Sequence, residues 1–113
     1  MADLHGADLS GCDLTGITLT GNFSGANLAG ADLSRATLTA LDMSGAKLTG
    51  AKLTGTTITT TTFVEAKLTG ADFDGSRISN SNFLLAQYGP TTFFGAVITA
   101  CEFSGPDPST AAT

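Results

Sequence analysis

The chain has 113 residues, of which 13% are charged, and five Lys and Arg against ten Asp and Glu give a formal net charge of −5. This length suits one domain with a single core, and so few scattered basic residues exclude a patch for a nucleic-acid backbone, so no nucleic-acid partner is expected. The N-terminal sequence MADLHG lacks the features of a secretory leader, and the aliphatic runs are too short to span a membrane, so we expect a cytoplasmic protein that does not bind membranes.

A large apolar residue recurs every five positions from Leu4 to Phe103, and this spacing matches neither a helix nor a flat strand. There are 21 such centres, and the residue two positions before each centre is small in nearly every unit. On extended backbone, residues two apart point to the same side. The centre and its small partner are therefore predicted to face inward, and the polar residue between them outward. The two remaining positions of each unit, often ending in Gly, are predicted to form a corner.

A short edge followed by a corner, repeated along the chain, predicts a polygonal coil whose successive turns pair edge to edge through backbone hydrogen bonds. The centres then stack inside the coil as a continuous apolar core. The residues predicted to form this structural core are Leu4, Leu9, Leu14, Leu28, Leu33, Leu38, Leu48, Leu53, Phe63, Leu68, Phe73, Phe83, Phe93 and Phe103.

The units ADLSG, ANLAG, AKLTG and ADFDG resemble the A-(D/N)-L-x-x signature of the pentapeptide repeat family. The resemblance covers residues 2–105. It implies an all-β fold, namely a right-handed quadrilateral parallel β-helix (solenoid) with about five coils of four pentapeptides. Residues 106–113, which contain two prolines and no centre, are predicted to form a flexible C-terminal tail.

One unit departs from the regular spacing. In the stretch LTGNF, Leu19 and Phe23 are only four residues apart, so Gly21 must serve both as the corner and as the small inward residue. Glycine tolerates such a compromise because it has no side chain. We therefore expect a local irregularity at Gly21, with the coil continuing beyond it.

No set of residues in the sequence suggests catalysis. His5 is the only histidine and has no cysteine at metal-binding spacing, while the aspartates occupy the outward position before a centre, which is the habit of the repeat. Cys12 and Cys101 fall on inward positions, where they are predicted to be buried, and they lie about four coils apart, too far for a disulfide. We therefore expect a protein that is not an enzyme and has no catalytic site, metal site or cofactor.

The function predicted from the repeat is a non-enzymatic scaffold that presents its outer faces to a partner protein or to another copy of itself. The resemblance implies one alternative, because some pentapeptide repeat proteins mimic duplex DNA, bind the type II topoisomerase gyrase and protect it from quinolones. That function needs a long acidic stripe. In this sequence Lys52 interrupts the column that carries Asp13, Asp32 and Asp72.

A second alternative is ice binding. Taking every fourth unit places threonine on both outward positions of one face in three successive coils, which is similar to the Thr-x-Thr rows of flat β-helical antifreeze proteins. Two strand residues span about 6.6 Å and stacked coils lie about 4.8 Å apart, and these spacings suit an ordered water layer. The candidate binding face consists of Thr18, Thr20, Thr37, Thr39, Thr57 and Thr59, and Arg77 interrupts it in the next coil.

The first turn of the coil starts so near the N-terminus that the sequence leaves no room for a capping helix. Leu4, Leu9 and Leu14 are therefore expected to be exposed there, together with the open edges of their strands. We expect this uncapped N-terminal coil to mediate self-association, most simply as a head-to-head homodimer with twofold symmetry.

Overall fold

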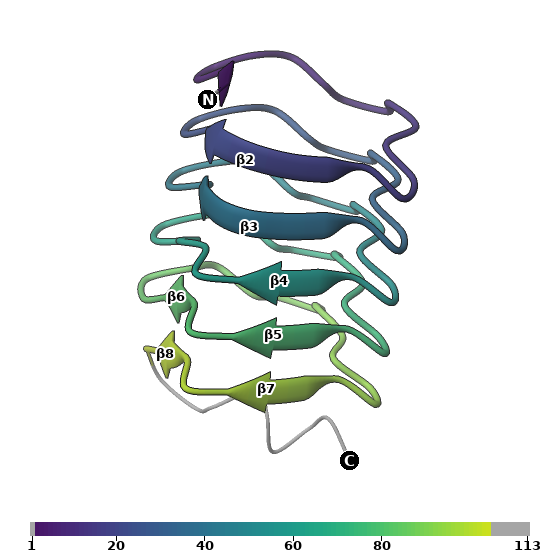
Figure 1. Cartoon of the computed structure of the whole chain (residues 1–113), viewed down its shortest axis with the longest axis vertical. Coiled ribbons are helices and arrows are strands. Elements are labelled where there is room, and N and C mark those ends of the chain that lie inside the picture. Colours follow the sequence, from purple (N-terminus) through teal and green to yellow (C-terminus); the bar gives the residue numbers. More distant parts are fainter. Residues whose placement is uncertain (1, 105–113) are drawn as a thin grey trace.

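The repeating units form short parallel strands that stack along one axis (Figure 1). The structure, a computed structural model, describes residues 2–104, and no helix occurs among them. One sheet contains six strands in the order β1 (Ala2–Asp3), β2 (Thr18–Asn22), β3 (Thr37–Asp42), β4 (Thr57–Thr59), β5 (Arg77–Ser79) and β7 (Val97–Thr99). A second sheet pairs β6 (Asn82–Phe83) with β8 (Glu102–Phe103). The predicted tail, residues 106–113, lies outside the described residues.

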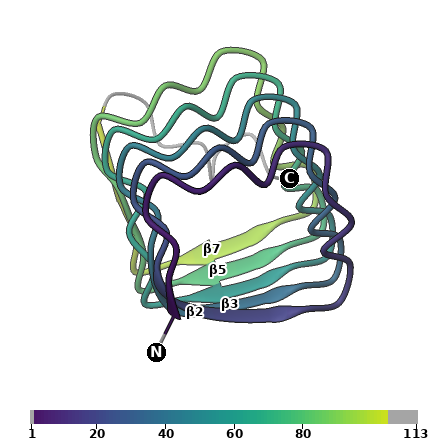
Figure 2. The same cartoon turned by 90° about the horizontal axis from the view of Figure 1, so that it is seen from above.

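Seen along the axis from the N-terminal end, the chain follows a four-sided path and turns clockwise as it recedes, so the coil is right-handed (Figure 2). Strand partners lie 20 residues apart along most of the chain, as in Thr37 with Thr57 and Thr57 with Arg77. The predicted right-handed quadrilateral parallel β-helix is therefore confirmed. The number of coils differs slightly from the prediction of about five, because four full turns separate Thr18 from Val97, with an incomplete turn at each end.

Three of the four corners share one kind of turn. The residue after the corner donates its N–H to the carbonyl of the preceding centre, as Ala31 does to Leu28 over 3.0 Å. The residue in between has a positive φ, and Gly30, with φ at 67°, adopts this left-handed conformation without the strain that a side chain would add. This requirement explains why glycine so often ends the repeat unit.

The fourth corner, which follows the strands of the six-stranded sheet, lacks this turn bond in the described residues. Apart from Gly21 beside the register shift, its left-handed residues are not glycine, and Thr60 and Asn80 occupy it in successive coils with φ at 51° and 52°. The inward hydroxyl of Thr61 donates instead to the carbonyl of Thr59 over 3.0 Å. The strand can therefore continue up to the corner, and the larger sheet forms on this side of the coil.

Large apolar side chains fill the inside of the coil. In the first half these are mostly leucines, such as Leu28 and Leu48, which are fully buried. In the second half, phenylalanine rings stack on those of the next coil, with centroids 4.6 Å apart for Phe63 and Phe83 and 5.0 Å apart for Phe83 and Phe103. The buried residues form one cluster along the axis, so the core is continuous.

Most of the residues that the repeat assigns to the core lie well inside it. Those with at most 4% of their surface exposed are Leu28, Leu33, Leu38, Leu48, Leu53, Phe63, Leu68, Phe73, Phe83 and Phe93. Leu9, Leu14 and Phe103 are only partly buried, and Leu4 is 40% exposed, which agrees with the exposure expected for the first coil and departs from the assignment of Leu4 to the core. These four centres belong to the first and last coils, where a neighbouring coil covers one side only.

The missing residue near Gly21 is absorbed as a shift in register. Thr18 pairs with Thr37, whereas Gly21 pairs with Leu41, one residue further along, and β2 is irregular between Leu19 and Gly21. Gly21 is buried and has φ at 108°, a conformation that suits glycine. The expected irregularity is confirmed. Leu41 is 2% exposed and takes the inward position beside Gly21, so a large side chain compensates for the one that is absent.

The substitution Leu48→Asp tests the core of the coil. Leu48 lies in register between Leu28 and Leu68, so its replacement would bury an unpaired carboxylate among apolar side chains. We expect a loss of about 3–5 kcal/mol in the free energy of unfolding. The control Lys47→Asp places the same charge at the exposed neighbouring position, where Asp8 stands in the first coil, and should melt like the wild type. A circular dichroism melt of Leu48→Asp that coincides with the wild-type melt would contradict this placement.

Candidate binding face

The outward side chains on one side of the coil form a surface rich in hydroxyl groups, here termed the threonine face. It comprises the outward residues of β2, β3, β4, β5 and β7. These residues are Thr18, Thr20, Thr37, Thr39, Thr57, Thr59, Arg77, Ser79, Val97 and Thr99. The apolar residue between each pair, from Leu19 to Ile98, packs against the core. The threonine face is thus the outer surface of the larger sheet before the corner, and it excludes β1 and the ends of β2 and β3 at Asn22 and Asp42.

Parallel pairing holds the threonines of this face in register. Thr18 pairs with Thr37 and Thr37 with Thr57, while Thr39 pairs with Thr59. The Oγ1 atoms of Thr59 and Thr39 are 3.5 Å apart in a hydroxyl contact between coils. Adjacent strands lie about 4.8 Å apart, and alternate residues on one strand about 6.6 Å apart. β2, β3 and β4 therefore present a regular array of hydroxyl and methyl groups.

The six threonines predicted as a binding face all reach the surface. The exposed members are Thr18, Thr20, Thr39 and Thr57, and those of intermediate exposure are Thr37 and Thr59. Thr20 lies beside the register shift at Gly21, so it has no aligned partner in β3, unlike the other five. The structure brings the six residues together on one face, but Thr20 is not in register with the other five.

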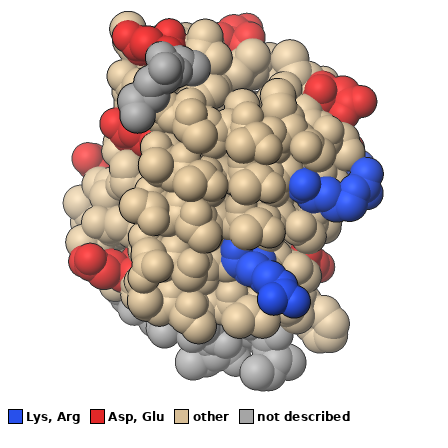
Figure 3. All heavy atoms as spheres, viewed as in Figure 1, with Lys and Arg blue, Asp and Glu red and all other residues tan. Residues whose placement is uncertain are grey.

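Charge is sparse on the threonine face. Arg77 is its single charged member, and the acidic and basic side chains in this view lie mainly around its borders (Figure 3). In the strand after Arg77, Val97 is 57% exposed and ends the pattern of hydroxyl groups. An uncharged sheet surface of this kind suits a flat complementary surface better than a small molecule, which usually binds in a concave pocket.

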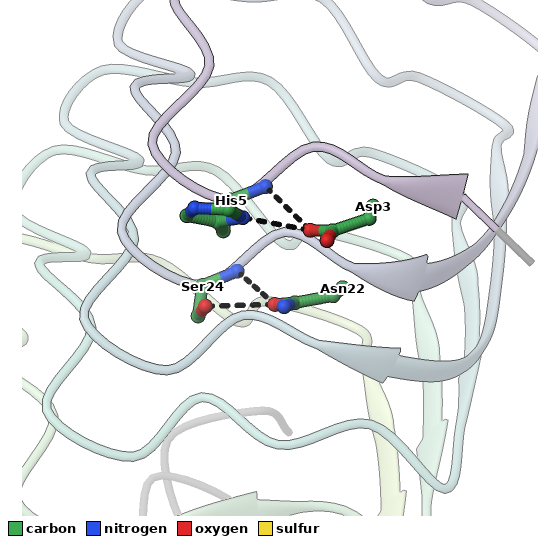
Figure 4. A network of polar contacts seen from close by, with 4 residues as sticks. All are labelled: Asp3, His5, Asn22 and Ser24. Atoms are coloured by element: carbon green, nitrogen blue, oxygen red, sulfur yellow. Dashed lines mark hydrogen bonds and ion pairs between the residues drawn. The ribbon is translucent and has the colours of Figure 1, made fainter.

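Asp and Asn have a structural task on the other three sides. The residue before the centre uses its Oδ1 to accept the N–H of the residue after the centre, as Asp32 does from Ser34 over 3.0 Å. Figure 4 shows two such contacts in adjacent coils, from His5 to Asp3 and from Ser24 to Asn22. Such side-chain turns offer the backbone a local hydrogen bond where it leaves the strand. The repeat pattern predicts that these residues face outward but does not reveal this task, for which a Ser or Thr two positions later is a signal.

These hydrogen bonds favour the ionised carboxylate. The Ser34 hydroxyl is the largest influence that lowers the pKa of Asp32, and the Ser34 N–H is the next largest. The positive charge of Lys52 acts in the same direction. In the first coil, the hydroxyl groups two residues further on lower the pKa of Asp8 and of Asp13 in the same way. These three aspartates are therefore charged at neutral pH and are poorly suited to acid catalysis.

The residue types that carry catalytic or redox chemistry do not come together. His5 Nδ1 lies 2.7 Å from Asp3 Oδ1 on the exposed first coil, and this contact raises the pKa of His5. Within residues 2–104, no three His, Cys, Asp or Glu side chains could hold a metal ion together. Cys12 and Cys101 form no disulfide, and they are only partly buried rather than buried as expected, because each lies in a terminal coil. The described part of the chain contains no helix that is long and apolar enough to cross a membrane.

The family model for pentapeptide repeats matches residues 2–21, 22–55 and 53–84, with eight copies of the repeat. These ranges cover more than half of the chain, and they agree with the four-sided coil and its turns. The chain belongs to the pentapeptide repeat family. No curated protein matches it significantly.

Solved structures have the same fold. A pentapeptide repeat protein from the Arabidopsis thaliana thylakoid lumen has a TM-score of 0.79 and 26% identity, over 82% of this chain and 66% of that one. QnrB1, a plasmid-mediated fluoroquinolone resistance protein, has a TM-score of 0.63 and 22% identity, over 88% of this chain and 64% of its own. The chain thus spans just under two thirds of the length of either structure. At 22% identity, the likeness to QnrB1 shows the fold alone.

Substitution of Asp32 tests the turn-closing task of the carboxylates. Asp32→Ala removes the acceptor for the Ser34 N–H, and we expect a lower melting temperature at neutral pH. Asp32→Asn keeps an acceptor of the same shape, as Asn22 and Asn27 provide in other turns, and should melt close to the wild type. Circular dichroism melts of the three proteins measure the difference. Equal melting of Asp32→Ala and Asp32→Asn would contradict the assigned task.

Acid should weaken the same turns. Because the folded-state pKa of Asp32 lies below its ordinary value of 3.8, its stabilisation is fully present above that value and is lost as the pH falls through it towards the folded-state pKa. We expect the wild type to lose thermal stability as the pH falls below about 4. Asp32→Asn should lose less over the same range, because its amide does not titrate. An identical loss in both proteins would mean that the Asp32 carboxylate does not stabilise the folded state.

Proposed function

We propose that this protein is a non-enzymatic scaffold that binds a partner protein through the threonine face. The observation that carries the proposal is the uncharged centre of this face on β2, β3 and β4, with charged side chains at its borders. A partner that docks there needs to desolvate few charges, and a sheet that is already ordered loses little conformational entropy on binding. The threonine methyl groups add apolar contact, and their hydroxyl groups can pair with polar groups of the partner.

The engagement of the carboxylates in turns supports a role without catalysis. Asp8, Asp13 and Asp32 already accept backbone N–H groups, so they are not poised for proton transfer to a substrate. The scaffold role therefore rests on the outer surface of the coil and not on a reacting group. The cytoplasmic location expected from the N-terminal sequence stays a prediction.

The double variant Thr37→Lys/Thr57→Lys tests the proposal. The fold should tolerate it, because Lys47 and Lys52 occupy the corresponding exposed position on neighbouring sides. A photoreactive residue at position 39 would first capture the partner protein, which is then purified. We expect the double variant to bind this partner at least about tenfold more weakly than the wild type, because two buried lysines would lose their hydration.

The matched control Lys47→Thr/Lys67→Thr makes the reverse change on a neighbouring side of the coil. It should bind the captured partner with wild-type affinity in the same titration. Wild-type affinity in the double variant Thr37→Lys/Thr57→Lys, with its melt unchanged, would overturn the assignment of the threonine face.

Gyrase binding is the first alternative, and the fold shared with QnrB1 is what supports it. Two features favour the scaffold instead. Lysines replace the acidic residues of the first coils, as Lys47 and Lys67 do in the column that begins with Asp8. Asp32 and Asp72 accept backbone N–H groups in turns, and Lys52 separates these two aspartates in their column, so the acidic residues form no continuous stripe there. A gyrase supercoiling assay with a quinolone separates the two functions, since binding to an unrelated partner leaves the quinolone sensitivity of gyrase unchanged.

Ice binding is the second alternative, favoured by the aligned threonines of β2, β3 and β4. Ordered water could occupy an array with spacings of about 4.8 and 6.6 Å. If this alternative is correct, the wild type shows thermal hysteresis in a nanolitre osmometer and Thr37→Lys/Thr57→Lys does not. Hysteresis with that dependence would replace the scaffold proposal, whereas a wild type without hysteresis would remove ice binding from consideration.

A further inference from the structure

The first coil, residues 2–20, carries apolar side chains that the second coil covers on one side only. Leu4 is 40% exposed and Ile17 is 36% exposed. In the second coil, by contrast, Phe23 and Leu28 are at most 1% exposed. The end of the coil therefore exposes the cross-section of the core.

The same end has unpaired strand edges. In an interior coil, the residue before a centre both donates its N–H to the preceding coil and accepts an N–H from it, as Asn27 does with Ala7 and Leu9 over 2.8 and 2.7 Å. Asp8 and Asp13 occupy this position in the first coil and make neither bond within residues 2–104. Open edges of this kind are templates for pairing with another strand.

We propose that a second copy of this chain covers the first coil in a head-to-head dimer. The two shorter dimensions of the molecule are 23 Å each, so the end of the coil offers roughly 500 Å² per copy and about 1,000 Å² in a dimer, the lower limit for a specific interface. A twofold axis perpendicular to the coil axis would bring the apolar ends of both copies into contact and would run their open edges antiparallel. This inference is independent of the partner proposed for the threonine face.

The rim of this interface is acidic. Asp3, Asp8 and Asp13 hold the outward positions of the first coil, and turn hydrogen bonds lower the pKa of each, so all three are charged at neutral pH. A head-to-head arrangement brings the two rims together. The apolar centre therefore favours association while the rim opposes it, and the dimer should become tighter when salt screens the rim.

Sedimentation velocity on the full 113-residue chain at micromolar concentration tests the interface. We expect a dimer for the wild type and a monomer for Leu4→Glu, which adds two carboxylates to the centre of the contact without burying them in the monomer. The control Leu85→Glu changes a side chain that is 63% exposed in a later coil. The fold should accept glutamate there, because Glu65 occupies the equivalent position one coil earlier with nearly the same φ. This control should remain a dimer. A monomeric wild type, or a dimer that survives Leu4→Glu, overturns the proposal.

A second measurement tests the head-to-head arrangement. Asp8→Asn removes a rim charge and keeps the turn, because Asn27 fills that position in the next coil. We expect this variant, and the wild type in 0.5 M rather than 0.05 M NaCl, to dissociate about three- to tenfold less readily. Stacking of the first coil on the last coil of another copy would instead place Asp8 near Gln87 and allow growth beyond a dimer. Species larger than a dimer, or dissociation constants unchanged by salt and by Asp8→Asn, therefore contradict the head-to-head arrangement.

Discussion

Stacking of each inward side chain on its counterpart one coil away is the constraint on which the rest of the structure depends. It requires each coil to bring its centres back into line with those of the next coil, because an uncorrected one-residue error would turn the centres away from the core. Most coils achieve this by closing after 20 residues, and the shorter coil with Gly21 achieves it through a register shift. The corners provide that closure, with left-handed residues such as Gly30 and Thr60 at fixed positions. The backbone hydrogen bonds between coils then align from the first coil to the last. The core, the corners and the backbone ladders therefore share one repeat, and each depends on the others keeping it.

The same periodicity explains how charge is distributed. On three sides, the residue before the centre faces a turn whose N–H needs an acceptor, and Asp32 or Asn22 supplies it. On the threonine face the strand runs on to a corner without that turn bond, so no such acceptor is required. Thr57, Arg77 and Val97 can therefore occupy equivalent positions in adjacent coils. The turn contact is common on these three sides but not universal, since Lys47 and Lys67 follow Asn27 in the column that begins with Asp8. The threonine face, which lacks the contact, is the side that we propose for binding a partner.

The spacing of the apolar centres predicted the inward positions, because burial follows a local alternation of inward and outward residues that is visible in the sequence. It also located the irregularity at Gly21, since a missing residue breaks the count. The four sides of the coil needed the family resemblance, because a spacing of five residues does not determine how sharply each corner turns. The carboxylate turns were missed because they depend on the hydrogen-bond geometry of the corner, as in Asp32 with Ser34. The exposure of Leu4 was expected from the place of its coil at the start of the repeat, whereas the repeat pattern alone assigns Leu4 to the core.

The pairing of Gly21 with Leu41 has a consequence for how such a chain can vary in length. A single lost residue shortened one coil, and the adjacent coil restored the lost volume with a larger side chain. Each coil touches only its immediate neighbours, so the disturbance ends there and the later ladders keep their phase. The gain or loss of a whole coil would consequently keep the remaining coils in register, whereas a smaller change in length needs a compensating change in the adjacent coil. The fold can therefore lengthen or shorten in steps of one coil.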